Sequence, residues 1–557
     1  MASAGIPSFA AVYGRVQDLE GFRGTILYIG PVAAAKNPND IWLGIEWDDP
    51  TRGKHDGSCV DKSGNSVRHF QCPEGSGSFV KPNKLLFGKS FEEALRERYV
   101  GLDAPEESPG DIVPDAFVLT STGVQKNIEF LGEHKIRKRQ QIDVLTKITM
   151  RNCSLSTAGG DFRSTAGHFV ELDLQDNLLS SWKEVGEIAV QLPKLQSFML
   201  HGNKMEPVTR GLMPCLPSGC FDALRVLALN YCGLNSWGEV LLLESRLPCL
   251  EELYLAANNF SDIGSSGEEG RSQPLFPHLR ILDVASCNIG SWEQVLTLDS
   301  LPALEEIVLD GNPVPGVLPC GPAQFATLKR ISASSTGLSS WTDVDAVSTY
   351  PKVEILRLAH VPLFAGKGAS EVRPIVIARI PALKLFNGSS VSSKERNTAE
   401  KIYLRQAKAE KSALAAAEPD TVFSSVDSAA AFALKHPRFE ELSEKYAGDI
   451  ISGGADADNG SSLGADLLEI KLNNVSFSAT TGQQCEPISR RLPAGLTVGR
   501  LKLMVKQLFG LDPIVQQLSI RDDKDTPPTL LDDDTATLRY VGACNGSEIY
   551  INETDAP

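Results

Sequence analysis

The chain has 557 residues, of which 42% are hydrophobic and 22% are charged, and its formal net charge is −16. This length is too great for one hydrophobic core and predicts three or four domains of ordinary globular composition. The acidic balance disfavours nucleic acid as a partner, and no apolar run reaches the roughly 18 residues of a membrane span. Residues 1–5 lack the pattern of a secretory signal, and the 11 cysteines include no Cys-x-x-Cys pair. We therefore expect a cytoplasmic chain with reduced thiols, no metal site and no membrane contact.

Glycines cluster between residues 14 and 88 among β-branched and aromatic residues, a composition typical of short twisted strands and tight turns. Within this segment, Gly-Lys-His-Asp-Gly at residues 53–57 follows Trp42–Asp48 and precedes Phe70–Cys72 and Gly77–Val80. Ordered in this way, these motifs resemble the CAP-Gly domain, a small all-β barrel that captures acidic C-terminal tails with an aromatic end. The family's loop usually carries Asn at the position of His55.

We expect residues 1–90 to form this domain, with a groove in which lysines meet carboxylates and aromatic residues hold the terminal ring. The segment has ten Lys/Arg and nine Asp/Glu, so the rest of the chain sums to −17. The module is thus the non-acidic part of an acidic chain, as binding of an acidic tail requires. The predicted tail-binding residues are Trp42, Lys54, His55, Asp56, Gly57, Phe79 and Lys81.

Residues 145–388 repeat at intervals of about 24 to 30 residues. Each unit has an apolar residue, a second apolar residue two positions later, and a small or polar residue three positions after that, as in Leu172, Leu174 and Asn177. This pattern resembles leucine-rich repeats and predicts an α/β solenoid in which a strand alternates with a returning segment. The units start at Leu172, Phe198, Leu227, Leu253, Leu282, Ile307, Ile331 and Leu356.

Two further regularities follow the repeats. Cys153, Cys232 and Cys287 occupy the Asn177 position, which predicts small buried residues rather than redox groups. A Ser-Trp pair follows every other strand, which predicts a helix capped by the serine, with the tryptophan packed on the convex side. The pairs are Ser181-Trp182, Ser236-Trp237, Ser291-Trp292 and Ser340-Trp341.

Strand side chains alternate, so the outward strand positions of the repeats should form a concave face. This face is predicted to be mostly acidic and therefore unsuited to an acidic tail, so we expect it to bind another surface of the same partner. Its predicted residues are Glu171, Asp173, Glu252, Asp283, Glu306, Asp310, Arg330 and Arg357.

The repeats need shielded ends. We expect an N-terminal cap at residues 112–144 and a charged, alanine-rich helical cap at 389–418. Residues 419–466 read as a linker that includes a further short helical stretch at 424–447 and the Gly-rich segment 453–464.

Residues 467–553 predict a strand at Leu467–Leu472, a second strand before Leu492 and an amphipathic helix at Thr497–Phe509. Short strands at Gln517–Arg521, Thr529–Leu531, Leu538–Val541 and Glu548–Asn552 should follow. This order resembles the ubiquitin-like β-grasp fold. Thr554–Pro557 lacks the Gly-Gly used for conjugation, which favours a built-in docking domain.

No Walker A loop, Gly-x-Ser-x-Gly or His-Glu-x-x-His motif occurs, so we expect no enzyme activity and no cofactor. The three-domain combination resembles the tubulin-folding cofactor E (tubulin-specific chaperone E) family. The resemblance implies a cytoplasmic chaperone that binds α-tubulin and acts with the other tubulin-folding cofactors to assemble and dissociate the αβ-tubulin heterodimer. The alternative is a microtubule-associated adaptor that captures tubulin tails on the cytoskeleton without chaperone activity. A ubiquitin-pathway enzyme is disfavoured by the missing catalytic motif.

Overall fold

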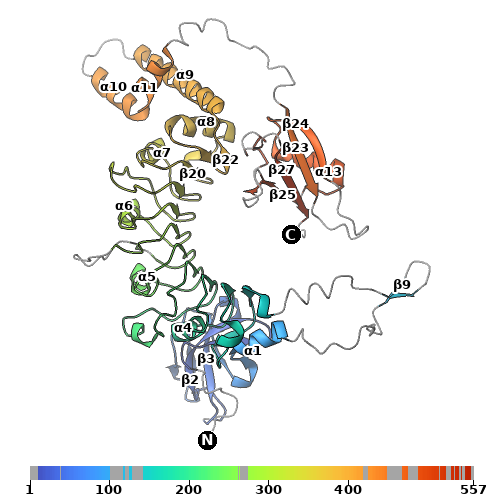
Figure 1. Ribbon diagram of the computed structural model, residues 1–557. Coiled ribbons are helices and arrows are strands. Elements are labelled where there is room, and N and C mark those ends of the chain that lie inside the picture. Colours follow the sequence, from blue (N-terminus) through green and yellow to red (C-terminus); the bar gives the residue numbers. More distant parts are fainter. Residues whose placement is uncertain are drawn as a thin grey trace. The chain divides into compact units, whose positions relative to one another are not determined.

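The chain forms two compact units, an N-terminal unit of residues 1–288 with 300–303 and a C-terminal unit of residues 289–299 with 304–557 (Figure 1). The computed structural model describes residues 11–37, 39–100, 117–119, 125–127, 142–260, 262–263, 274–417, 424–447, 467–474, 487–513, 515–521, 529–531, 534–538, 541, 543 and 546–553. The predicted N-terminal cap lies mostly outside these residues, and the Gly-rich linker segment lies wholly outside them.

The N-terminal unit begins with a small antiparallel sheet of order β6-β3-β2-β1-β7. Alternate side chains of β1–β3 point inward, and Val16, Ile26, Leu43 and Ile45 form a core against Trp47. The sheet strands are β1 Arg15–Asp18, β2 Arg23–Gly30, β3 Trp42–Trp47, β6 Gly77–Val80 and β7 Leu85–Leu86, beside a hairpin of β4 Ser58–Val60 and β5 Ser66–Arg68 and the 3-10 turns η1 Pro50–Arg52 and η2 Pro82–Lys84.

The chain leaves this module through β8 Lys89–Ser90, which leads directly into helix α1 Phe91–Leu95 and the π-helical turn η3 Arg96–Val100. Ser90 forms a capping box with Glu93, and Phe91, Ala94 and Leu95 are buried. The strands β9 Phe117–Leu119 and β10 Gln125–Asn127 pair antiparallel.

Parallel strands of the repeats follow in the order β11-β13-β14-β15-β16-β17. The middle residue of each strand, such as Leu172 in β13 and Leu253 in β16, is buried, and its neighbours point to the other face. The elements are η4 Ile142–Val144, β11 Lys147–Thr149, β12 Leu155–Thr157, α3 Arg163–Ala166, β13 Glu171–Asp173, α4 Trp182–Val190, β14 Ser197–Met199, η5 Met213–Cys215, β15 Val226–Ala228, α5 Trp237–Glu244, β16 Glu252–Tyr254 and β17 Ile281–Asp283.

The small or polar residue after each strand bonds to the backbone of adjacent turns, as predicted. The side-chain oxygen of Asn203 accepts from the backbone N–H of Asn177, and that of Asn258 accepts from Cys232. The buried Cys232 thiol donates to the carbonyl of Leu200 at 3.2 Å, and burial raises its pKa to about 12. Cys232 and Cys287 are therefore structural residues, as the sequence pattern indicated, but the prediction is wrong for Cys153, which is only half-buried because it lies in the first turn of the array.

The repeat pattern continues in the C-terminal unit, where β18–β21 pair in parallel and β22 turns back antiparallel on β21. The strands are β18 Glu306–Val308, β19 Arg330–Ser332, β20 Ile355–Arg357, β21 Leu385–Phe386 and β22 Ser389–Ser390, with α6 Trp292–Leu296, η6 Thr297–Ser300, α7 Trp341–Val347, η7 Pro362–Phe364 and α8 Ala369–Arg379 between them.

All four Ser-Trp pairs start a helix, and three of the four tryptophans are buried, the exception being Trp341. Each serine lies at the N-cap of its helix, as predicted. However, only the Ser340 side chain accepts a backbone N–H of its helix, so the predicted capping hydrogen bond is absent at the other three serines. At α4, the Glu206 carboxylate of the next repeat accepts from the Trp182 N–H at 3.1 Å and replaces Ser181 as the cap.

Three helices follow the last repeat: α9 Ser393–Ala417, α10 Ser424–Lys435 and α11 Phe439–Lys445. Glu400 is 1% exposed and accepts hydrogen bonds from Lys445 at 2.6 Å and from the Tyr446 hydroxyl at 2.7 Å. Arg438 also reaches this carboxylate, at 3.3 Å. The predicted cap is therefore a helical cluster that extends to Tyr446 and surrounds a buried ionic network.

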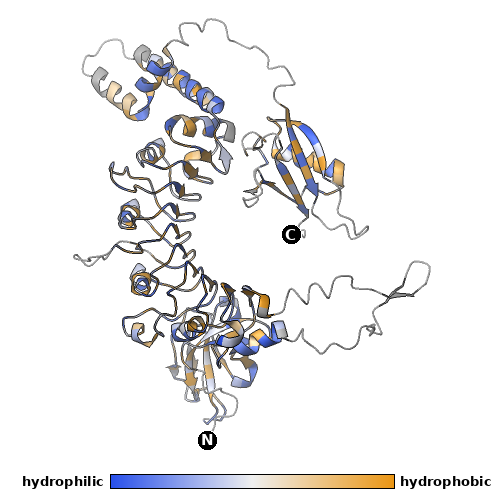
Figure 2. Ribbon diagram, viewed as in Figure 1, coloured by the Kyte–Doolittle hydropathy of each residue, from blue (hydrophilic) through white to orange (hydrophobic). Residues whose placement is uncertain are grey.

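The C-terminal domain is a mixed sheet of order β24-β23-β27-β25-β26 with one helix. Ile470 and Leu472 are buried while Glu469 and Lys471 are more exposed. Figure 2 shows hydrophobic and hydrophilic residues alternating along the strands of this domain. Its elements are β23 Leu467–Asn474, β24 Ile488–Pro493, α13 Val498–Phe509, β25 Gln516–Arg521, β26 Thr529–Leu530 and β27 Glu548–Glu553.

One predicted strand of this domain is wrong. Leu538 and Val541 lie in turns, and residues 539–540 lie outside the described chain. Val541 donates its backbone N–H to Thr537 at 3.0 Å, and Ala543 donates to Leu538 at 2.9 Å, so local turn bonds replace a strand ladder. The apolar Leu538 was expected to lie in a strand, but its side chain is buried in the core from a turn.

Candidate functional site

The predicted groove is built on the loop at residues 53–57, which two glycines allow to bend. A Cβ on Gly53 would lie 2.1 Å from the Gly75 carbonyl oxygen, and one on Gly57 would lie 2.1 Å from that of Phe70. Gly57 also has a φ of +93°, which only glycine adopts without strain. The loop is fixed to β6 because Lys54 and His55 both donate their backbone N–H groups to the Gly77 carbonyl.

An aromatic cluster lies behind the loop. The Phe79 ring centroid is 4.7 Å from that of His55, 5.5 Å from that of Phe70 and 5.4 Å from that of His69. Tyr28 extends the cluster at 5.0 Å from His69. The structure therefore brings the predicted residues His55 and Phe79 together and adds aromatic neighbours that the sequence analysis left unassigned.

His55 also holds the loop in place, a role that the sequence analysis did not predict. Its Nδ1 accepts the backbone N–H of Gly57 at 3.0 Å, so the neutral ring carries its proton on Nε2. Burial lowers the pKa of His55, and the neighbouring Lys54 lowers it further. The ring is thus a neutral, apolar-packed part of the loop at neutral pH, with one N–H available as a donor.

The charged residues of the predicted tail-binding set differ in whether they already form ion pairs. Asp56 accepts from the Ser58 N–H and hydroxyl and pairs with Arg68 at 2.6 Å, and these contacts lower its pKa to about 2. Lys81 pairs with Asp40 at 3.0 Å and lies 5.2 Å above the Trp42 ring. Lys54 is exposed, and within residues 11–100 no carboxylate of the described chain pairs with it. The loop therefore presents Lys54 as its available positive charge.

Comparison with known proteins shows which proteins this chain resembles. A CAP-Gly domain model matches residues 12–85, and a ubiquitin-like domain model matches residues 474–557. The chain is 30% identical over 561 residues to tubulin-specific chaperone E of Danio rerio, covering 97% of this chain and 98% of that one. It is 29% identical over 554 residues to tubulin-folding cofactor E of Arabidopsis thaliana, covering 97% of each. The chain belongs to the tubulin-folding cofactor E family. The predicted fold class, with CAP-Gly, repeat and ubiquitin-like parts, is confirmed.

Seven of the eight residues predicted for the concave face of this cofactor E family member lie on repeat strands, whereas Asp310 lies in the turn after β18. Their carboxylates already have partners. In the N-terminal unit, Glu171 pairs with Lys147 and Asp173 with Arg151, each at 2.6 Å. The other two accept hydrogen bonds locally, Glu252 from the Tyr254 hydroxyl at 2.7 Å and Asp283 from the Ala285 N–H at 2.9 Å.

In the C-terminal unit, Glu306 pairs with Arg330 at 3.2 Å. Asp310 accepts from the Ser332 hydroxyl and the Ser334 N–H, each at 2.7 Å. Arg357 is exposed at the end of β20. Several of the carboxylates at the outward strand positions are thus neutralised by ion pairs with Lys or Arg. The face is therefore less acidic than a count of carboxylates implies.

Tyr28, His69 and Phe70 are the site residues that sequence reasoning missed. Phe70 packs against Gly44. A Cβ on Gly44 would lie 2.4 Å from the Phe70 ring, so the ring can occupy this position only because residue 44 is glycine. The signal was present, since Phe70–Cys72 was among the quoted motifs, but only the backbone bonds of His69 and Phe70 to the Gly57 carbonyl place Phe70 behind the loop. Among the described residues, no group of His, Cys, Asp and Glu is arranged to hold a metal ion, and no helix has the length and apolarity to cross a membrane.

Proposed function

We propose that this chain is a tubulin chaperone that binds α-tubulin and, with the other tubulin-folding cofactors, assists assembly and dissociation of the αβ-tubulin heterodimer. The CAP-Gly module binds the acidic, aromatic-ended tail of α-tubulin, and the repeats bind its folded body. The protein works by binding rather than by catalysis, in the cytoplasm. Family membership supports the overall role, because the relatives are named as tubulin-folding cofactors or tubulin-specific chaperones.

The observation that carries tail binding is the exposed Lys54, for which the described residues supply no carboxylate partner, next in sequence to His55 of the aromatic cluster with Phe79. A charge-assisted hydrogen bond from a free ammonium to a tail carboxylate requires no existing ion pair to be broken. Lys81 would first have to leave Asp40, so it contributes less. The terminal aromatic ring of the tail would pack edge-on or offset against the cluster, as aromatic pairs prefer.

Tail binding is tested with a peptide ending Glu-Glu-Tyr. Lys54→Ala should weaken binding by about 1–3 kcal/mol, because a hydrogen bond between charged groups is lost. The matched control is Lys62→Ala, since Lys62 is an exposed lysine of the same module that contacts only the Lys36 carbonyl, at 3.3 Å. Equal affinity of the Lys54 variant and the control, or equal affinity for a peptide without its terminal tyrosine, would contradict the proposal.

The role in the heterodimer is tested with αβ-tubulin and the partner cofactors. The full chain should release α-tubulin from β-tubulin, whereas an adaptor without chaperone activity would bind the intact heterodimer or polymer and leave it whole. Residues 112–418 alone, which lack the CAP-Gly module, should bind tail-cleaved α-tubulin with only a modest loss relative to intact α-tubulin, because the repeats hold the body. Deleting Leu467–Pro557 should leave peptide binding intact and reduce dissociation, since only contacts with the tubulin body can favour one state over the other. Full activity of the truncated chain would exclude the ubiquitin-like domain from the mechanism.

A further inference from the structure

The CAP-Gly module joins the repeats with almost no intervening chain. Only Phe87 and Gly88 separate strand β7 of the module from β8, and β8 pairs in parallel with β12 of the first repeat. Gly88 has a φ of +86°, and a Cβ there would lie 2.7 Å from the Ser154 carbonyl oxygen and 2.5 Å from the Ser156 hydroxyl. A two-residue connection that ends in a paired strand cannot act as a flexible linker.

Apolar packing continues this junction. The rings of Phe91 and Phe162 stack with centroids 4.4 Å apart, and both side chains are at most 2% exposed. Phe91 begins helix α1, directly after the module, and Phe162 lies just before α3 in the repeats. Burial of two large rings makes this contact part of a core rather than a surface contact.

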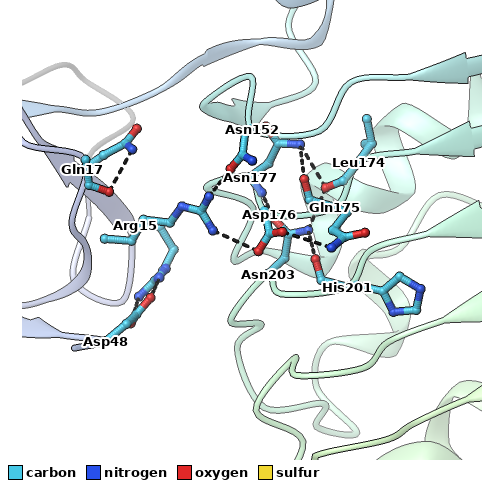
Figure 3. Close-up of polar contacts among 12 residues, drawn as sticks. Arg15, Gln17, Asp48, Asn152, Leu174, Gln175, Asp176, Asn177, His201 and Asn203 are labelled. Carbon is cyan, nitrogen blue, oxygen red and sulfur yellow. Dashed lines mark hydrogen bonds and ion pairs between the residues drawn. The ribbon is translucent and has the colours of Figure 1, made fainter. Parts of the chain in front are cut away.

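Polar contacts fix the module at a second place, on the turns of the first repeats (Figure 3). Arg23 donates to Asp176 at 3.1 Å and also to the side-chain oxygen of Asn152. The Asp48 Oδ1 pairs with Lys204 at 3.0 Å and also accepts from the buried Arg15 at 2.8 Å, and Arg15 bonds to Oδ2 as well. These cations lower the pKa of Asp48 against the effect of burial. Single exposed pairs contribute little, but here they act together with a strand pair and a buried ring pair.

The same strands carry both this junction and the groove. In the β2–β3 pair, Gly24 is opposite Trp47 at the end where Arg23 and Asp48 contact the repeats. The loop at residues 53–57 lies at this same end, because it is bonded to Gly77, which is opposite Glu46 in the β3–β6 pair. Glu46 and Trp47 are adjacent in β3, so one short stiff strand connects the loop to the junction. Movement of the groove relative to the first repeats therefore requires the junction to open.

We propose that the module and the first repeats form one composite binding surface that grips the tail and the folded body of a single partner molecule at once. This inference rests on the proposed function and adds a geometric requirement: the partner is a folded protein whose own acidic, aromatic-ended tail reaches the groove. Binding of the body then makes tail binding intramolecular, and such linkage raises affinity by about 10²–10⁴-fold without any new contact. A free tail peptide gains nothing from the junction.

The test loosens the junction in the full chain without touching the groove. Arg23→Asp places a carboxylate beside Asp176, and Gly88→Val forces a side chain against the Ser154 carbonyl. Both variants should keep the affinity for the Glu-Glu-Tyr peptide within twofold and lose about tenfold or more in affinity for intact α-tubulin. The double variant Arg23→Asp/Asp176→Arg should recover much of this loss, which a general folding defect would not allow. Hydrogen exchange at Lys89, whose backbone N–H donates to the Ser154 carbonyl at 2.9 Å, reports whether the junction has opened.

The outcomes separate the possible failures. Faster exchange at Lys89 with unchanged affinity for α-tubulin overturns the composite surface. Unchanged exchange in both variants overturns the assignment of these residues to the junction. Absence of peptide binding by the unmodified chain overturns the proposed tail capture and the composite surface with it, while the exchange data would still show whether the module is fixed on the repeats.

Discussion

Replacing Asn177 by alanine should destabilise the N-terminal repeats more than any single surface change. The Asn177 amide is 1% exposed and joins two turns (Figure 3). Its oxygen accepts the backbone N–H groups of Cys153 at 2.9 Å and Leu155 at 3.0 Å. Its nitrogen donates to the carbonyls of Met150 at 2.7 Å and Leu174 at 2.9 Å. Alanine leaves all four backbone groups without this partner in a buried place.

The magnitude follows from these four bonds. A typical intramolecular hydrogen bond contributes about 1 kcal/mol, so Asn177→Ala should lower the free energy of unfolding of the repeats by about 4 kcal/mol. Cysteine should be a milder substitution than alanine at this position. Cys232 occupies the equivalent position of another repeat, where its thiol donates to the Leu200 carbonyl. Where cysteine stands, Met205 donates its N–H to the Cys232 carbonyl instead, at 2.9 Å. Asn177→Cys should therefore cost about half as much as Asn177→Ala.

The assay is hydrogen exchange of the full chain, read at Cys153 and Leu155, together with urea unfolding followed by tryptophan fluorescence. Exchange at these two amides should accelerate by about two to three powers of ten in Asn177→Ala, and less in Asn177→Cys, since about 1.4 kcal/mol corresponds to a factor of ten. Gln175→Ala is the matched control, because its side chain contacts only Asp176, at 3.0 Å. A loss below about 1 kcal/mol for alanine, or a larger loss for cysteine, would refute the reasoning.

Three other predictions follow from the side chains described above. Iodoacetamide at pH 7.5 should modify the exposed Cys215 and Cys249 and spare Cys232, whose pKa is raised to about 12 by burial; peptide mass mapping checks this, and rapid labelling of Cys232 before unfolding would contradict it. His55 has a folded pKa below its ordinary 6.5, so the unfolded module binds the proton first and stability should fall as the pH drops below about 6.5; His55→Asn should flatten this slope in urea titrations, and an unchanged slope would show that another group titrates. Glu400→Gln should destabilise the helical cluster by about 3 kcal/mol, because the buried Arg438 and the half-exposed Lys445 lose the carboxylate that they share; hydrogen exchange of α11 measures it, and a neutral effect would show that the network contributes nothing net.

The sequence alone determined the order and kind of the domains, because each leaves a local signature. The repeat of an apolar pair and a small polar residue defines strands such as β13 and β16 and their buried ladder, since the periodicity is that of the strand itself. The glycine loop at residues 53–57 and the amphipathic helix α13 were likewise predictable, because backbone freedom and helical spacing are properties of short segments. The predicted tail-binding set and the domain boundaries remain predictions.

Only the tertiary structure decided which partners these residues have. Leu538–Val541 resembled a strand, yet burial explains Leu538 and turn bonds explain Val541. The charge of the concave face could not be read by counting carboxylates, because Lys147 neutralises Glu171 from a strand 24 residues away. The docking of Arg23 on Asp176 spans 153 residues, and no local pattern encodes such a contact. Periodicity reports which way a side chain points, whereas its partner depends on which distant segment the fold brings next to it.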